Sequence, residues 1–202
     1  MKVGFRDVAP DRPVRGEAAK SFRQKLENGF FDRFMSGAKI LDIGFHGGIE
    51  DSIPIFSHAI GIDVGYPGYD GVTLPFPDAS IDAIYSSHML EHVPDSKPII
   101  SDWHRVLKFG GFIVCVVPHQ HLYEKRRALP SRWNPDHKRF YTPASLLREF
   151  EAALETNSYR VRHLADNDHG YDYAIGPGQH AQGSYEIELV VEKIAKPDWE
   201  IL

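Results

Sequence analysis

The sequence predicts a single α/β domain with a doubly wound, mostly parallel seven-stranded sheet and an antiparallel pair of strands at one edge. Three observations support this fold class. Short apolar stretches of strand type alternate with stretches of helical period, which is typical of a parallel sheet covered on both faces. Glycines directly follow the first apolar stretch. The last two strand-type stretches have no helix between them, as expected for antiparallel neighbours.

Length and composition agree with one domain over residues 1–202. Hydrophobic residues make up 42% and charged residues 25% of the chain, as in ordinary globular domains. The net charge of −5 gives no electrostatic reason to expect nucleic-acid binding. The longest apolar run, at 112–117, is too short to cross a bilayer, so we expect no membrane insertion. The sequence leaves the oligomeric state open.

Two features favour a cytoplasmic location. The only cysteine, Cys115, lies inside the apolar run, so no disulfide forms within the chain. The first residues lack the apolar segment of a secretory signal.

The N-terminal part, residues 1–36, is predicted to be an arm followed by a helix. Residues 1–15 are polar and contain proline. Between residues 17 and 35, apolar residues recur at three- and four-residue steps, which indicates one face of an amphipathic helix. These residues are Phe22, Leu26, Phe30, Phe31 and Phe34.

The remaining elements follow in order. Strand-type stretches lie at 39–43, 58–63, 81–86, 112–117, 159–164 and 185–194. Helices are expected briefly from Ile49, then at 95–107, and at 142–154, where Thr142 is a good N-cap with Pro143 behind it. The segments 118–141 and 166–182 leave the carboxyl end of the sheet, where ligands bind in such folds. We expect them to be substrate-side loops.

The turn after the first strand is the strongest functional signal. It runs from Asp42 to Gly48 with the sequence DIGFHGG, and glycine lets a backbone turn sharply and approach a ligand closely. Aligned from Gly44, the dinucleotide pattern G-x-G-x-x-G fails at His46 and Ile49. Asp63 ends the second strand, where a carboxylate can accept both hydroxyls of a ribose.

This turn resembles the D-x-G-x-G-x-G motif of class I S-adenosylmethionine-dependent methyltransferases, matching at Asp42, Gly44 and Gly48 but not at His46. Residues 74–95 (LPFPDASIDAIYSSHMLEHVPD) resemble the segment around the fourth strand in the small-molecule branch of that family. Residues 102–118 (DWHRVLKFGGFIVCVVP) and 136–150 (DHKRFYTPASLLREF) resemble its following segments, with Phe109 in place of the usual proline. The similarity covers residues 38–153 and implies a Rossmann-like fold with S-adenosylmethionine as cofactor.

The resemblance also implies a role for individual residues. It places Asp42 and Gly44 under the methionine part of the cofactor, and Asp63 on the ribose hydroxyls. Asp70 would face the adenine amino group, although its GYDG context is equally typical of a plain turn. His46 either contacts the cofactor or is a surface turn residue. The implied cofactor-binding set is Asp42, Gly44, His46, Gly48, Asp63, Asp70, Ser86 and Ser87, the two serines flanking the sulfonium.

The eleven histidines raise two hypotheses. Imidazoles can bind zinc or iron, but no HExxH motif, cysteine pair or His-x-carboxylate cluster accompanies them, so we expect no metal site. A hydroxyl acceptor needs a base near neutral pH, and histidine is suited to that task. The candidates are His88, His119 and His137, and we expect at least one to be the base, although a structural or substrate-binding role fits each one alone.

The segment 118–141 suggests the acceptor. It carries six Lys and Arg residues: Lys125, Arg126, Arg127, Arg132, Lys138 and Arg139. Guanidinium groups bind phosphate and carboxylate well, which favours an anionic acceptor such as a phosphorylated or nucleotide-linked sugar; a solvated loop is the alternative.

We therefore expect O-methylation of a small-molecule or glycan acceptor, for example in polysaccharide biosynthesis. One alternative is a non-catalytic member that binds the cofactor or acts as a scaffold, suggested by His46, Phe109 and the short 63–70 connection. The other is a nicotinamide-dependent oxidoreductase, against which the failed dinucleotide pattern argues.

Overall fold

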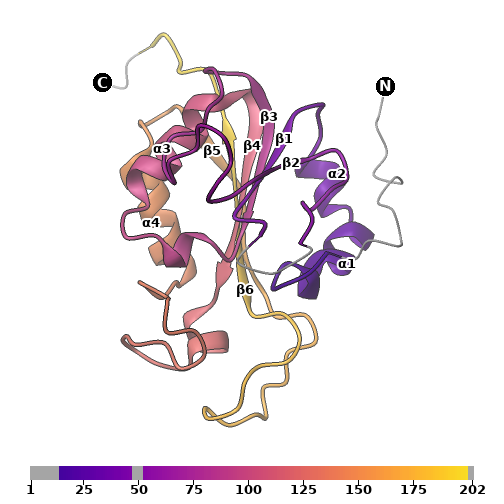
Figure 1. The fold of residues 1–202 in the computed structure, drawn as a ribbon. Helices are drawn as coiled ribbons and strands as arrows, with labels where there is room; N and C mark the ends of the chain where they lie inside the picture. Colours follow the sequence, from indigo (N-terminus) through magenta and orange to yellow (C-terminus); the bar gives the residue numbers. More distant parts are fainter. Residues whose placement is uncertain (1–13, 47–51, 200–202) are drawn as a thin grey trace.

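A computed structural model describes residues 14–46 and 52–199 of the chain. Its sheet contains β1 (Ile40–Ile43), β2 (Ile60–Ile62), β3 (Ile81–Ser87), β4 (Leu107–Pro118), β5 (Tyr159–Asn167) and β6 (Glu186–Lys193), in the order β2-β1-β3-β4-β6-β5. The first four strands are parallel, and β6 is antiparallel to both β4 and β5. The predicted mixed sheet with an antiparallel edge is confirmed (Figure 1).

The predicted count of seven strands is wrong for the described part of the chain, which has six. The connection from β2 to β3 contains turns, and Gly65, Gly68 and Gly71 all have positive φ angles of 80–96°. Extended strands need negative φ, so this segment does not add a strand outside β2.

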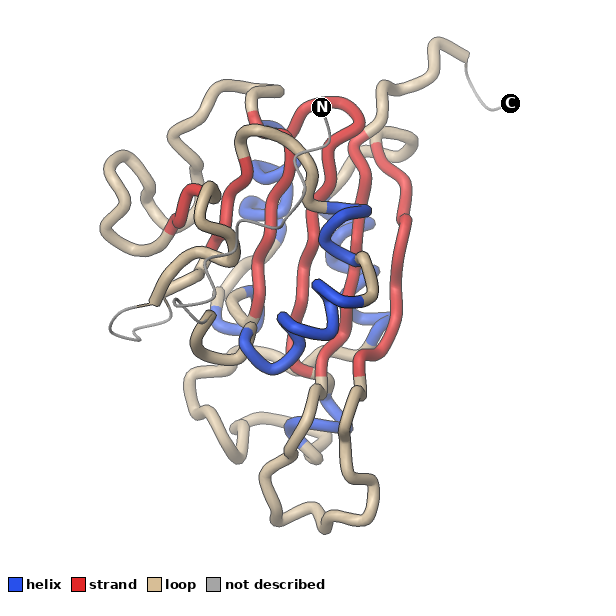
Figure 2. The backbone as a smooth tube through the Cα atoms, turned by 90° about the vertical axis from the view of Figure 1, so that its right-hand side faces the viewer, coloured by secondary structure: helices blue, strands red, loops and turns tan. Residues whose placement is uncertain are grey.

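Helices cover both faces of the sheet, as predicted for a doubly wound fold. Figures 1 and 2 show α1 (Ala19–Glu27) and α2 (Phe30–Phe34) on one face, and α3 (Lys97–Val106) and α4 (Pro143–Ala153) on the other. One core cluster centres on Trp103 and Phe150 with residues of β3, β4 and β6, and the other on Phe31 and Phe34 with Tyr85. The helices α3 and α4 lie within two residues of their predicted bounds.

The single N-terminal helix predicted over residues 17–35 is broken. Gly29 has a φ of 75°, a left-handed conformation that ends a right-handed helix. The Asn28 side chain then accepts a hydrogen bond from the Phe30 amide at 3.0 Å. The break lets Phe31 and Phe34 both reach the core. Of the brief helix predicted from Ile49, residues 52–59 are not helical, and the part up to residue 51 lies outside the described residues.

Helix α1 is attached to the sheet by a buried ammonium group. Lys25 Nζ lies 2.7 Å from a carboxylate oxygen of Glu186 and 2.9 Å from one of Glu188, both on β6. Burial lowers the pKa of Lys25, but the two carboxylates outweigh it and the net pKa is raised. The lysine therefore remains charged, and the helix is held where its N-terminal end borders the strand ends.

The two expected substrate-side loops extend beyond the end of the sheet at which β4 finishes (Figure 1). The first contains a π-helical turn, Gln120–Glu124. Lys125 Nζ donates to the Gln179 carbonyl at 2.7 Å and so links the two loops. Among the described residues, no helix is both long enough and apolar enough to span a membrane.

Candidate cofactor site at the strand ends

A cavity of about 850 Å³ lies beyond the carboxyl ends of β1, β2 and β3. Its lining comes from the segment 14–18 before α1, the turn after β1 together with Ile53, the end of β2 with Tyr69 and Gly71, the end of β3 with the residues after it, and Asn134 with Asp136. The position is the one expected for a ligand in a doubly wound sheet.

Asp42 lies at the floor of this cavity and is only 5% exposed. Its Oδ2 atom accepts a hydrogen bond from the Ile55 amide at 2.6 Å. Burial raises the pKa of the carboxyl to about 7, and the charge of Asp63 contributes in the same direction. A buried acid with so little compensation favours a cationic ligand group nearby.

The turn after β1 depends on two glycines. Gly44 has a φ of 81°, and a Cβ atom placed on it would lie 2.6 Å from Met89 Cγ. A Cβ on Gly61 of β2 would lie 2.6 Å from the Phe45 ring. Both glycines therefore allow the turn to pack tightly against its neighbours. Gly48 lies outside the described residues.

Asp63 and His46 meet at the rim of the cavity, and both line it. The His46 amide donates to Asp63 Oδ2 at 2.9 Å, and the Val64 amide donates to Oδ1 at 2.7 Å. These two bonds fix the orientation of the Asp63 carboxylate at the rim. Val64, which also lines the cavity, is 90% exposed and offers an apolar surface beside it.

Asp70 stands just outside the cavity wall. Its Oδ1 atom accepts hydrogen bonds from the amides of Val72, at 2.9 Å, and Thr73, at 2.6 Å. These backbone bonds lower the pKa of the exposed carboxyl. The turn interpretation of this residue thus has structural support, and its contact with adenine stays a prediction.

Polar side chains line the cavity at the end of β3 and directly after it. Ser87 and His88 line the cavity, whereas Ser86 is buried in the strand beside them. Within the described part of the chain, Ser87 Oγ and His88 Nε2 are buried without a hydrogen-bond partner. His88 has a φ of 52°, a left-handed backbone that is rare for residues with a Cβ.

Two carboxylates flank the His88 ring. Nδ1 lies 3.7 Å from Glu91 Oε1, and Nε2 lies 3.5 Å from Glu186 Oε1. Burial lowers the pKa of His88, but Glu186 and Glu91 outweigh it, so the net pKa is raised. Sequence reasoning missed both acids. Glu91 could have been found from its spacing three residues after His88 and next to His92, whereas Glu186 has no local signal.

The other two histidine candidates lie outside the cavity lining. His119 Nδ1 accepts hydrogen bonds from the amides of His121 and Leu122, at 3.0 and 3.3 Å, and so caps the π-helical turn. Burial lowers its pKa. His137 is 5% exposed and its Nδ1 contacts Glu124. Of the three candidates for the base, the structure brings only His88 to the site.

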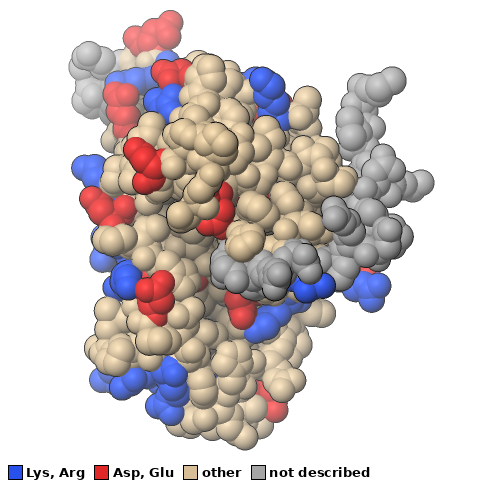
Figure 3. Space-filling model, in the orientation of Figure 1, with Lys and Arg blue, Asp and Glu red and all other residues tan. Residues whose placement is uncertain are grey.

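The basic residues of the first loop also lie outside the cavity lining. Lys and Arg side chains gather at the lower left of the face in Figure 3, where Figure 1 places the segment after β4. Arg139 is structural: it binds both oxygens of Glu149, at 3.0 and 3.1 Å, and the Val93 carbonyl at 2.8 Å. Arg126 donates to the Pro130 carbonyl.

Comparisons with known proteins agree with this geometry. A family model described as a methyltransferase domain matches residues 60–115. A probable S-adenosylmethionine-dependent methyltransferase of Mycolicibacterium smegmatis is 30% identical over 128 residues, which are 63% of this chain and 47% of that protein. The ubiquinone biosynthesis O-methyltransferase of Aeromonas salmonicida is 31% identical and aligns with 58% of this chain and 62% of its own length. The chain thus spans less than two thirds of these relatives.

Solved structures show the same fold. A SAM-dependent methyltransferase from Aquifex aeolicus aligns with 89% of this chain and 94% of its own, with a TM-score of 0.56 at 13% identity. One from Methanosarcina mazei aligns with 82% of this chain and 97% of its own, with a TM-score of 0.55 at 17% identity.

The cavity also fits the cofactor that this family uses, S-adenosylmethionine. The cofactor carries ammonium and sulfonium charges, and the buried Asp42 supplies the anion at the floor. Asp63 supplies oriented acceptors for a ribose, and Ser87 Oγ is a buried polar atom that lacks a partner in the described chain. The family model and the relatives show that the chain is similar to S-adenosylmethionine-dependent methyltransferases, and the solved structures show that it has their fold.

Proposed function

We propose that the chain transfers a methyl group from S-adenosylmethionine to a hydroxyl oxygen of a small-molecule or glycan acceptor. The observation that carries the proposal is the composition of one cavity. It is lined by Asp42 and Asp63 at the ends of the first two strands and by His88 after the third. The relative from Aeromonas salmonicida, named an O-methyltransferase, supports transfer to oxygen.

His88 is the proposed general base. When bound, S-adenosylmethionine supplies a methyl group already activated by its sulfonium, so the protein has mainly to align the acceptor. In its neutral form the His88 ring, which lines the cavity, takes the hydroxyl proton. Glu186 and Glu91, 3.5 and 3.7 Å from the ring nitrogens, stabilise the imidazolium that results.

The acceptor class has two candidates. A sugar-type, anionic acceptor is supported by the basic side chains over the first loop (Figure 3). A quinone-type acceptor is supported by the names of two relatives: the O-methyltransferase of ubiquinone biosynthesis, and a demethylmenaquinone methyltransferase of Staphylococcus epidermidis that is 41% identical over 51 residues, 25% of this chain and 21% of that protein. We also propose a cytoplasmic location, which the single cysteine favours.

Calorimetry with S-adenosylmethionine and S-adenosylhomocysteine tests the proposal. We expect both to bind, and we expect Asp63→Ala to weaken binding tenfold or more, the scale of lost charge-assisted hydrogen bonds. Absence of binding at millimolar concentration would reject the cofactor site. Titration with NADH tests the oxidoreductase alternative, for which we expect no heat of binding.

A screen of phosphorylated sugars and hydroxylated quinone precursors then tests the transfer itself. Mass analysis of the product identifies the methylated atom. We expect His88→Gln to lower kcat while the affinity for S-adenosylhomocysteine stays within a factor of about two. Cofactor binding without transfer to any acceptor would favour the non-catalytic alternative.

A further inference from the structure

A buried carboxylate beside the cavity lies among histidine nitrogens. Glu91 follows β3 in a short 3₁₀ helix, Leu90–His92, and is fully buried. Its Oε1 atom lies 3.7 Å from His92 Nε2 and 4.0 Å from His137 Nε2. Neither oxygen of Glu91 has a hydrogen-bond partner in the described part of the chain. A buried carboxylate left in that condition is costly unless something else occupies the space between these atoms.

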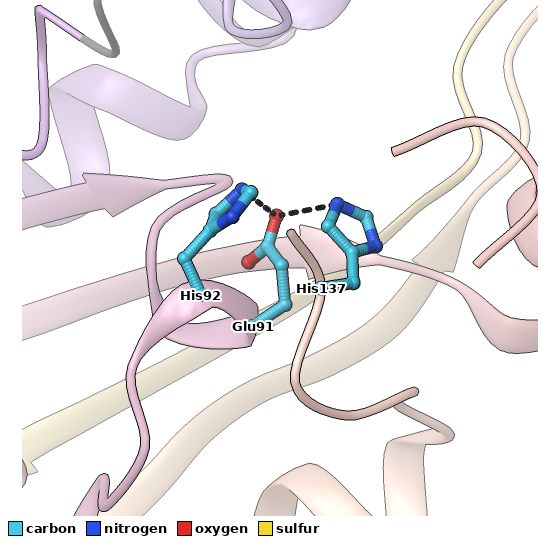
Figure 4. Close-up of side chains that lie close together, drawn as sticks. All are labelled: Glu91, His92 and His137. Atoms are coloured by element: carbon cyan, nitrogen blue, oxygen red, sulfur yellow. Dashed lines mark ion pairs between the residues drawn. The ribbon is translucent and has the colours of Figure 1, made fainter. Parts of the chain in front are cut away.

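A further carboxylate lies at Nδ1 of each of the two histidine rings. His92 Nδ1 lies 3.0 Å from Asp136 Oδ2, and His137 Nδ1 contacts Glu124 Oε1. A carboxylate at Nδ1 holds the proton on that nitrogen and leaves a lone pair on Nε2. Both Nε2 atoms point toward the same oxygen of Glu91 (Figure 4). The Nε2 atoms of the two histidines and Oε1 of Glu91 therefore direct lone pairs into the same space, and no proton has to lie between them.

This arrangement is the one that metal-binding histidines adopt, with Nε2 toward the ion and Nδ1 donating to a carboxylate. The three ligand atoms lie within 4.8 Å of one another. Around a tetrahedral Zn²⁺, bonds of about 2.0–2.2 Å place ligand atoms about 3.4 Å apart. The cluster needs to contract by less than about 1.5 Å at its widest pair to reach that spacing.

We propose that Glu91, His92 and His137 form a binding site for a divalent transition-metal ion of the Zn²⁺ class. Two imidazoles with one carboxylate favour such an ion over Mg²⁺ or Ca²⁺, which prefer oxygen ligands. His92 and Asp136 also line the cofactor cavity, so the ion lies at its wall and keeps a fourth position for water or a ligand oxygen. His88 Nδ1, 3.7 Å from the same Glu91 oxygen, borders the site.

The expectation of no metal site rested on the absence of motifs whose ligands lie close together in the chain. Glu91 and His92 are adjacent, but the third ligand comes from the loop after β4. That loop is brought back to β3 partly by the amide of Lys138, which donates to the Glu91 carbonyl at 2.8 Å. The site depends on this contact between segments.

Calorimetric titration of tag-free, chelator-treated protein with ZnCl₂, in the absence of S-adenosylmethionine, tests the site. We expect one Zn²⁺ per chain, no saturable binding of Mg²⁺, and the visible absorption of tetrahedral Co²⁺ when Co²⁺ replaces Zn²⁺. His92→Ala and His137→Ala should each weaken Zn²⁺ binding by more than 100-fold. His169→Ala, which removes an exposed histidine outside the cluster, is the matched control and should bind as the wild type does.

Glu124→Gln keeps all three ligands and changes the partner of His137; the side chain that replaces Glu124 still offers an oxygen to the Ser131 hydroxyl. We expect it to weaken Zn²⁺ binding 10- to 100-fold with an unchanged circular dichroism spectrum. The inference is overturned if the wild type binds no stoichiometric Zn²⁺, or if the two alanine variants at His92 and His137 bind Zn²⁺ as tightly as His169→Ala. Because the titration uses neither cofactor nor acceptor, its outcome is independent of whether the chain transfers methyl groups.

Discussion

Replacement of Asp42 by asparagine should change how the stability of the protein depends on pH. Asp42 is 5% exposed, and its Oδ2 accepts the Ile55 amide at 2.6 Å. Asparagine has nearly the same shape and keeps an acceptor for that amide, but it does not titrate. The variant therefore isolates the free energy linked to ionisation of one buried carboxyl.

The magnitude follows from the pKa of Asp42, which burial raises from 3.8 to about 7. Below pH 4 the group is protonated in both the folded and the unfolded chain. Between pH 4 and 7 the unfolded chain releases this proton while the folded chain retains it, so the free energy of unfolding of the wild type falls as pH rises. The difference of about 3 pH units between the folded and unfolded pKa values of Asp42 corresponds to about 4 kcal/mol of the free energy of unfolding. This amount is lost completely once the pH is above 7.

Urea unfolding of both proteins at intervals from pH 4 to pH 8 measures this difference. Other titrating groups are common to the two proteins and cancel when the free energies are subtracted. We expect Asp42→Asn to gain up to about 4 kcal/mol relative to the wild type across this range. A difference that stays constant within about 0.5 kcal/mol would show that Asp42 is not held protonated by its surroundings. The carboxylic acid band in the infrared spectrum, lost near pH 7 in the wild type alone, provides a second readout.

Three further predictions concern the scaffold of the site. Lys25→Met leaves the buried Glu186 and Glu188 without their cation and should lower the free energy of unfolding by about 3–5 kcal/mol in urea. The control Lys196→Met breaks an exposed pair with Glu155 and should cost less than about 1 kcal/mol in the same experiment. Equal losses would show that the Lys25 pair contributes no more than an exposed one. Gly44→Ala places a Cβ against Met89 and should weaken S-adenosylhomocysteine binding at least tenfold by calorimetry. The control Gly29→Ala has a similar positive φ but open space around it, so it should cost only about 1 kcal/mol of stability and leave binding unchanged. His119→Ala removes the cap of the π-helical turn and should lower stability by about 1 kcal/mol while the affinity for S-adenosylhomocysteine is unchanged; a loss of affinity would place His119 in the site after all.

The sheet and the acids at its strand ends could be predicted from the sequence because their signals are local. Asp42 and Gly44 follow a short apolar stretch directly, and Asp63 ends the next one. Thr142 and Pro143 marked the start of α4 for the same reason, since a helix cap involves only neighbouring residues. Gly29 shows the limit of helical periodicity: the apolar spacing continued through it, but its left-handed backbone divided the helix.

The polar groups around His88 could not be predicted from the sequence because they come from distant parts of the chain. Glu186 lies on β6 and reaches both His88 and Lys25 through the sheet. Its position in an alternating strand pattern resembles that of a solvent-facing acid, and only tertiary packing covers it. The convergence of His137 on Glu91 depends in the same way on the path of a loop, which residue type and spacing do not specify.

The attachment of α1 to the sheet also connects the wall of the cavity to the buried ion pair of Lys25. Residues 14–18, directly before α1, form part of the cavity wall, and Glu17 and Lys20 both contact the Tyr185 hydroxyl at the start of β6. The same helix carries Lys25, whose ion pair with Glu186 borders His88. The cavity wall and the buried charge pair therefore belong to one N-terminal element, so a substitution at Lys25 acts on the cavity without changing a residue that lines it.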